Sequence, residues 1–135
     1  MLTIRQLKDT YNAEQIILVL LTRVFFNTAT KADVDDFIAN NKINWTLLYK
    51  ITRAHGVRPL VYYIVKHFTV NVPSAFESRL QKQHNKSRRL NLQMGIAASK
   101  LIADLQEKDI TIIPYKGPVL AHSYYPDIAL REKTS

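Results

Sequence analysis

The chain has 135 residues, of which 47% are hydrophobic and 22% charged, and it contains no cysteine. This composition excludes a disordered chain, and the lack of cysteine excludes a disulfide framework and a thiolate metal site. The net charge of +8 favours contact with phosphate groups, although many basic proteins bind no nucleic acid, and a basic half balanced by an acidic half elsewhere is a third interpretation. The most apolar run, Ile16–Leu21, is far shorter than the roughly 20 residues that span a bilayer, and no secretory signal is evident. We therefore expect a cytoplasmic protein without a membrane contact.

The first part of the chain predicts a helical bundle. Residues Ala13–Asn27 are apolar nearly all round, which is typical of a helix at the centre of a bundle. A polar connection follows, after which Asp33 is predicted to cap a short helix. The side chains expected on the buried face of that helix are Val34, Phe37 and Ile38.

Two further helices are predicted around Gly56. Asn44 is the expected N-cap of the first, and Gly56 stands where a left-handed residue would end it. Pro59 suits the first turn of the second, since its missing N–H costs nothing there. The stripe of the first helix expected to face the core consists of Leu47, Ile51 and Ala54.

A long helix is predicted from Ser74 to about Lys108. Ser74 and Glu77 match a capping box. The stretch Arg79–Arg89 is polar and basic, which indicates a break or an exposed portion. Such a charge run is more often a solvated helix face than a contact for a phosphate backbone, and both interpretations stay open here.

The period of the pattern changes after this helix. Ile110–Ile113 is a β-branched run that predicts a short strand, and Lys116-Gly117-Pro118 follows before a predicted short helix over Val119–Tyr125. A single strand needs partners, so we expect an incomplete sheet. The predicted fold class is mainly α, with a helical domain over 1–108 and the start of an α+β domain over 109–135.

The string from Asp109 to Arg131 resembles a recurring signature of uncharacterised bacterial nucleotidyltransferases: a short strand, Lys-Gly, a small helix ending in Tyr, then Pro-Asp and Leu-Arg. The segments Trp45–Leu48 and Ala54–Leu60 are similar to the helical N-terminal region of the same group. The resemblance implies the N-terminal portion of a protein with a DNA polymerase beta-like nucleotidyltransferase fold.

The resemblance also implies a site. Lys116 and Gly117 match the turn that holds the triphosphate of an NTP, and Arg131 matches the arginine before the strand that carries an Asp-x-Asp pair for Mg²⁺. No such pair follows Arg131 in this sequence. We therefore expect Mg²⁺ and NTP to bind only in the complete protein, no catalytic or metal-binding residue in this chain, and no nucleotide transfer by this chain alone.

Other interpretations remain. Asp33 and Asp35 have the spacing of a carboxylate pair, but side chains two apart on a helix diverge, so a metal site is not expected. The histidines are scattered, which argues against zinc. The alternatives are a small basic helical module that binds nucleic acid or a protein partner, and a regulatory remnant that forms a homo-oligomer through its unpaired strand.

Overall fold

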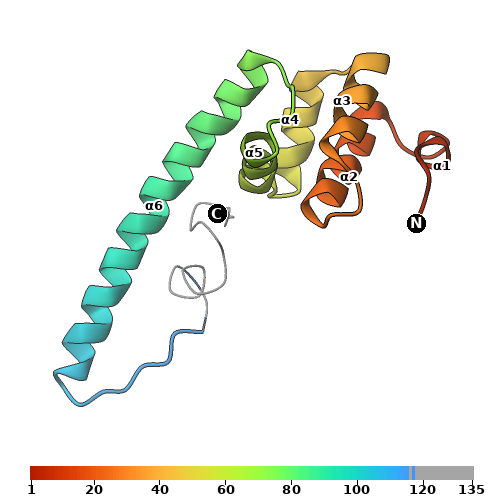
Figure 1. The fold of residues 1–135 in the computed structure, drawn as a ribbon. Coiled ribbons are helices and arrows are strands. Elements are labelled where there is room, and N and C mark those ends of the chain that lie inside the picture. The colour runs from red at the N-terminus through yellow and green to blue at the C-terminus, as the bar shows by residue number, and fades with distance from the viewer. Residues whose placement is uncertain (116, 118–135) are drawn as a thin grey trace.

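The computed structural model describes residues 1–115 and 117, and these residues form α-helices without a β-strand (Figure 1). The predicted mainly α fold is therefore confirmed. No helix in these residues is both long and apolar enough to cross a membrane. The helices are α1 (Ile4–Lys8), α2 (Ala13–Phe25), α3 (Lys31–Asn40), α4 (Trp45–Ala54), α5 (Arg58–His67) and α6 (Ser74–Gln106).

Helix α2 lies at the centre of the bundle and contacts α1, α3, α4 and α5. Its apolar side chains are buried or partly buried on almost every side, as the sequence predicts. Helix α3 contributes Val34 and Phe37 to the same core, and the predicted Ile38 packs at its edge. Helices α4 and α5 close the bundle on the side that faces α6.

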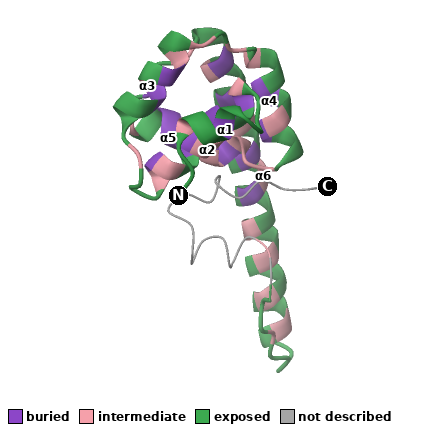
Figure 2. Cartoon of the chain, turned by 90° about the vertical axis from the view of Figure 1, so that its right-hand side faces the viewer, coloured by how far each residue is buried: buried purple, intermediate pink, exposed green. Residues whose placement is uncertain are grey.

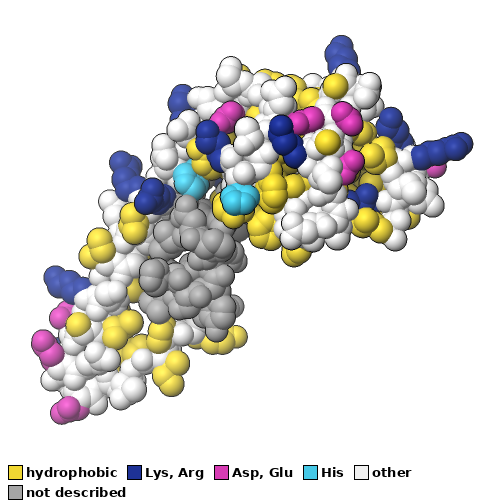
Figure 3. Space-filling model, in the orientation of Figure 1, with side chains coloured by type: hydrophobic (Ala, Val, Ile, Leu, Met, Phe, Trp, Pro, Cys, Tyr) yellow, Lys and Arg dark blue, Asp and Glu magenta, His cyan; other side chains and the backbone are white. Residues whose placement is uncertain are grey.

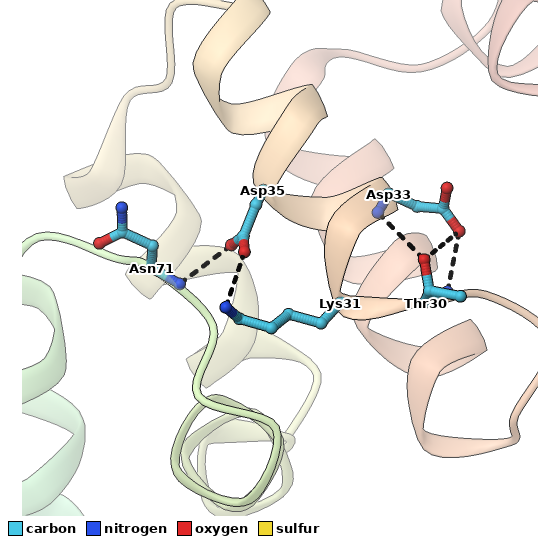
Figure 4. Close-up of polar contacts among 5 residues, drawn as sticks. All are labelled: Thr30, Lys31, Asp33, Asp35 and Asn71. Carbon is cyan, nitrogen blue, oxygen red and sulfur yellow. Dashed lines mark hydrogen bonds and ion pairs between the residues drawn. The ribbon is translucent and has the colours of Figure 1, made fainter.

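Capping boxes begin α1, α2 and α3, and the third corrects a prediction (Figure 4). The N-cap of α3 is Thr30 and not Asp33. The Asp33 carboxylate accepts hydrogen bonds from the Thr30 backbone N–H at 2.8 Å and from the Thr30 hydroxyl at 3.1 Å. Asp33 therefore does stabilise the start of the helix, but from its third position.

The buried face of α4 is shifted by one position along the sequence from the predicted stripe. Asn44 caps the helix and Gly56 ends it with φ +66°, as predicted, but Leu48 and Thr52 are the fully buried side chains, at 0% exposure. Leu47 is 37% exposed. Thr52 can be buried because its hydroxyl donates to the Tyr49 carbonyl at 2.7 Å, which satisfies the polar group inside the helix.

Helix α6 starts at Ser74, as predicted, but Ser74 does not cap it. Pro73 occupies the N-cap position without a side-chain hydrogen bond. The Glu77 carboxylate instead pairs with the Lys66 ammonium of α5 at 2.8 Å, so the predicted capping box is wrong. The Glu77 side chain, which the capping box required, instead forms an ion pair with helix α5.

The long helix is continuous through Arg79–Arg89, so the predicted break is absent and the predicted exposed portion is confirmed. At 33 residues it is about 50 Å long, and only its first half packs on the bundle (Figure 1). Figure 2 shows the buried residues of α6 next to the bundle, and mostly exposed residues beyond it. These buried residues are Phe76, Leu80, Ser87 and Asn91.

The end of α6 is a Schellman-type turn. The Ile110 N–H donates to the Leu105 carbonyl at 2.9 Å and the Asp109 N–H to the Gln106 carbonyl at 3.0 Å, with Asp109 at φ 59°. The following residues Ile110–Ile113 do not form the predicted strand. A strand is stabilised by hydrogen bonds to a neighbour, and the described residues provide none.

Candidate functional site

The predicted phosphate turn is only partly within the described residues. Lys116, Arg131 and the predicted helix over Val119–Tyr125 lie outside them, so the structure does not show whether these residues come together. Gly117 is described, and its φ of 102° is a backbone conformation that glycine adopts readily and side-chain-bearing residues rarely do. A glycine at this position is therefore required by the backbone, as expected for a turn that approaches a ligand closely.

The segment that leads to Gly117 exposes large apolar side chains. Ile110 is 47% exposed, Ile113 86% and Tyr115 81%. Isoleucine is among the residues most often buried in folded proteins. This segment therefore has the composition of a core strand, and its exposure fits a strand whose sheet is absent from the described residues.

Two acidic side chains of α3, those of Asp33 and Asp35, have structural partners (Figure 4). Asp33 belongs to the capping box, and Asp35 accepts from the Lys31 ammonium at 3.2 Å and from the Asn71 backbone N–H at 3.0 Å. Within residues 1–115 and 117, no group of histidine, aspartate and glutamate side chains is arranged to hold a metal ion. The described residues therefore do not fit a Mg²⁺ site.

Two of the three histidines in the described residues contact aromatic side chains. His67 stacks on Tyr63 with ring centroids 5.2 Å apart and an interplanar angle of 8°, and His84 lies 4.7 Å from the Tyr62 ring. His55 follows the last turn of α4. His122 lies outside the described residues.

Two small hollows occupy the side of α6 next to the bundle. One, of about 360 Å³, is lined by Tyr49, Arg79, Lys82, Gln83 and Lys86. The other, of about 410 Å³, is lined by Asn85, Lys86 and Arg89. Among the described residues neither lining includes an acidic side chain, and Lys86 belongs to both. Figure 3 shows Lys and Arg side chains along the edge of α6.

The first hollow contains an ordered arginine–tyrosine contact. The Arg79 guanidinium lies 3.9 Å from the centre of the Tyr49 ring, close enough for a cation–π contact. Arg58 donates to the Tyr49 hydroxyl at 3.3 Å from its own guanidinium. No local sequence pattern indicates this cluster, since Tyr49 and Arg79 belong to helices that meet only in the tertiary structure.

A third hollow, of about 540 Å³, lies between α2, α4 and α5. It is lined mainly by apolar side chains, with His55, Arg23 and Gln15 among the polar exceptions. The Arg23 guanidinium donates to the Leu2 carbonyl at 2.7 Å, so this arginine holds the N-terminus against α2. The groove has the apolar character of a binding surface but no cluster of groups that could carry out a reaction.

Comparison with known proteins gives one match. The family model of an uncharacterised nucleotidyltransferase matches residues 41–134, which include α4, α5, α6 and the predicted phosphate turn. No curated protein and no solved structure matches the chain. Because the match covers more than half of the sequence, the chain belongs to this family of uncharacterised nucleotidyltransferases.

Proposed function

We propose that this chain contributes the nucleotide-binding turn of a nucleotidyltransferase, in which Lys116 and Gly117 hold the triphosphate of an NTP. The observation that carries the proposal is the family match over 41–134, which includes both residues. Two physical features support it. The positive φ of Gly117 leaves its backbone open to a phosphate, and a lysine beside it adds a positive charge.

Arg131 has an assisting role in this proposal, through a phosphate contact or by orienting a carboxylate strand in the complete protein. The bacterial origin and the DNA polymerase beta-like superfamily placement belong to the same proposal. Under it, residues 1–108 are the helical domain and residues 109–135 begin the transferase domain. A cytoplasmic location also remains a prediction.

The nucleotide is proposed to bind this turn in the complete protein, and this chain by itself is proposed not to transfer a nucleotide. Transfer of a nucleotidyl group needs divalent cations held by carboxylates, and the described residues do not provide such a group. After Lys116 the sequence has only Asp127 and Glu132, which are not a close pair. When bound in the complete protein, Mg²⁺ would neutralise the triphosphate.

Isothermal titration with ATP tests the binding step. The complete protein is expected to bind ATP, and Lys116→Ala in that protein is expected to weaken binding, because it removes the charge beside the turn. Lys108→Ala is the matched control, since this exposed lysine lies just after α6 and outside the turn. Equal affinities for the wild type and Lys116→Ala would contradict the assignment.

Incubation with radiolabelled NTP and Mg²⁺ tests the second part of the proposal. No label is expected to pass to nucleic acid, to protein or to a small hydroxyl compound. Metal-dependent incorporation by the purified chain would contradict it. The two assays are independent, because the first needs neither metal nor acceptor.

A further inference from the structure

In the described part of the chain, a row of basic side chains without ion-pair partners runs along one face of α6. Arg79, Lys82, Lys86 and Arg89 follow one another at steps of three, four and three residues, which places them on the same side of an α-helix. The row is about 15 Å long at the rise of an α-helix. All four residues are exposed.

Within α6 itself the row has no acidic counterpart. From Ser78 to Ala103 the helix contains no aspartate or glutamate. Glu77, the acidic residue just before the row, is paired with Lys66 on α5. The positive charge of the row is therefore not neutralised within its own helix, and an anionic partner fits it.

The length of the row selects among anionic partners. One phosphate group cannot reach cations spread over about 15 Å, whereas a polymer with a phosphate at each unit can. A membrane-surface helix places large apolar side chains beside its basic ones. The exposed large apolar residues of α6 begin only at Leu92, past the end of the row, so a lipid surface fits less well.

The hollows beside the row favour a single strand over a duplex. Both hollows are open to the surface, and their volumes of about 360 and 410 Å³ are large enough for one nucleotide unit but not for the width of a double helix. Asn85 and Gln83 add amide groups to the lining, which can hydrogen-bond to phosphate or base edges.

Arg79 supplies a fixed phosphate-binding group at one end of the row. Its guanidinium lies over the Tyr49 ring, and Tyr49 is itself only 9% exposed. A guanidinium stacked on a ring keeps its N–H groups in the plane, where they can meet a phosphate in a bidentate manner. The ring thus orients the arginine before any ligand arrives.

We infer that the face of α6 formed by Arg79, Lys82, Lys86 and Arg89 binds the phosphate backbone of a single-stranded nucleic acid. This binding does not depend on nucleotidyl transfer, because it uses only residues of the helical part and needs neither NTP nor Mg²⁺. In the complete protein the same surface would hold a nucleic-acid acceptor, a consequence that does rest on the proposed function.

The test is fluorescence anisotropy with a labelled single-stranded oligonucleotide of mixed sequence, titrated at several salt concentrations without NTP or Mg²⁺. A plot of the log of the binding constant against log salt has a negative slope. The variant Lys82→Gln/Lys86→Gln/Arg89→Gln is expected to make this slope shallower by about 2, at about 0.7 for each lost phosphate contact. Far-UV circular dichroism checks that the variant is folded.

The matched control removes the same number of charges elsewhere, through Arg5→Gln/Lys42→Gln/Arg88→Gln. Arg88 is adjacent to Arg89 in sequence but lies about 100° from Arg89 and about 180° from Arg79 around the helix, so it points away from the row. The control is expected to keep most of the slope. An equal loss in both triple variants would overturn the inference, since it would show attraction by net charge alone.

Three further measurements distinguish single-stranded nucleic acid from a duplex and from a lipid surface. Arg79→Lys keeps the charge but loses the planar donors, so it is expected to weaken binding while leaving the slope unchanged. Duplex of the same sequence is expected to bind more weakly than the single strand. Tighter binding to the duplex, or binding to phosphatidylserine vesicles without binding to the oligonucleotide, would overturn the inference.

Discussion

The Glu14 carboxylate joins two helices through one partly buried hydrogen bond, and the free-energy cost of removing it can be calculated. Glu14 lies in the first turn of α2 and is only 7% exposed. Its Oε1 accepts from the backbone N–H of Asn44, the N-cap of α4, at 2.7 Å. Glu14→Ala would remove this acceptor and leave the Asn44 N–H without it.

The magnitude follows from the type of bond. A hydrogen bond to a charged group contributes about 1.5–3 kcal/mol, and a carboxylate near a helix N-terminus adds about 0.3–1 kcal/mol. We expect Glu14→Ala to lower the free energy of unfolding by about 2–4 kcal/mol. Glu14→Gln keeps a neutral acceptor of about half the strength, so about 1–2 kcal/mol is expected.

Urea unfolding followed by far-UV circular dichroism measures both variants. The midpoint should move and the slope m should not, because the surface exposed on unfolding is unchanged. The contrast between the two variants is the decisive result. If Glu14→Gln costs as much as Glu14→Ala, or if neither costs more than about 0.5 kcal/mol, the hydrogen bond to Asn44 is not what holds α4 to α2.

Three other changes test separate features of the fold. Leu80→Ala, in a side chain 1% exposed between α6 and the bundle, is expected to cost about 2–5 kcal/mol in urea unfolding, and a cost below about 1 kcal/mol would mean that α6 does not pack there. Gly56→Ala is expected to cost about 1 kcal/mol in the same assay, because φ is +66° while no neighbouring atom lies within 4 Å of the added Cβ; no loss would contradict the left-handed turn. The hydrogen bond that the Lys66 ammonium donates to the Glu77 carboxylate, followed by the charge of Glu77, raises the pKa of Lys66 above its usual value of 10.5. The stabilisation from this pair is therefore complete below pH 10.5 and is lost as the pH rises through the raised pKa. Stability measured across that alkaline range should fall less in Lys66→Met than in the wild type, and parallel curves would contradict this assignment.

Much of the candidate site was accessible from sequence as a family signature, and little of it from local physics. Lys116-Gly117 alone is an ordinary turn, and only the longer string to Arg131 led to the nucleotidyltransferase family that the comparison then matched. The Tyr49–Arg79 contact was inaccessible to either approach. It requires α4 and α6 to be side by side, which no short pattern encodes.

The errors in the helix caps have a common cause. Asp33 and Ser74 were both assigned as N-caps because their residue types suit that position. Thr30 instead caps α3 and forms a capping box with Asp33 three residues later, and Glu77 forms an ion pair with Lys66 of the adjacent helix. Local preference thus decides a cap only where no tertiary partner competes for the same side chain.

The sequence by itself determined where the helices run and which of them is central. Periodicity, Gly56 and the apolar run of α2 reflect backbone geometry and burial, which act over a few residues. Only the tertiary structure decided which face of α4 is buried, since that depends on the neighbours that α2, α5 and α6 provide. The same holds for Ile110–Ile113, because a β-branched run becomes a strand only when another strand supplies its hydrogen bonds.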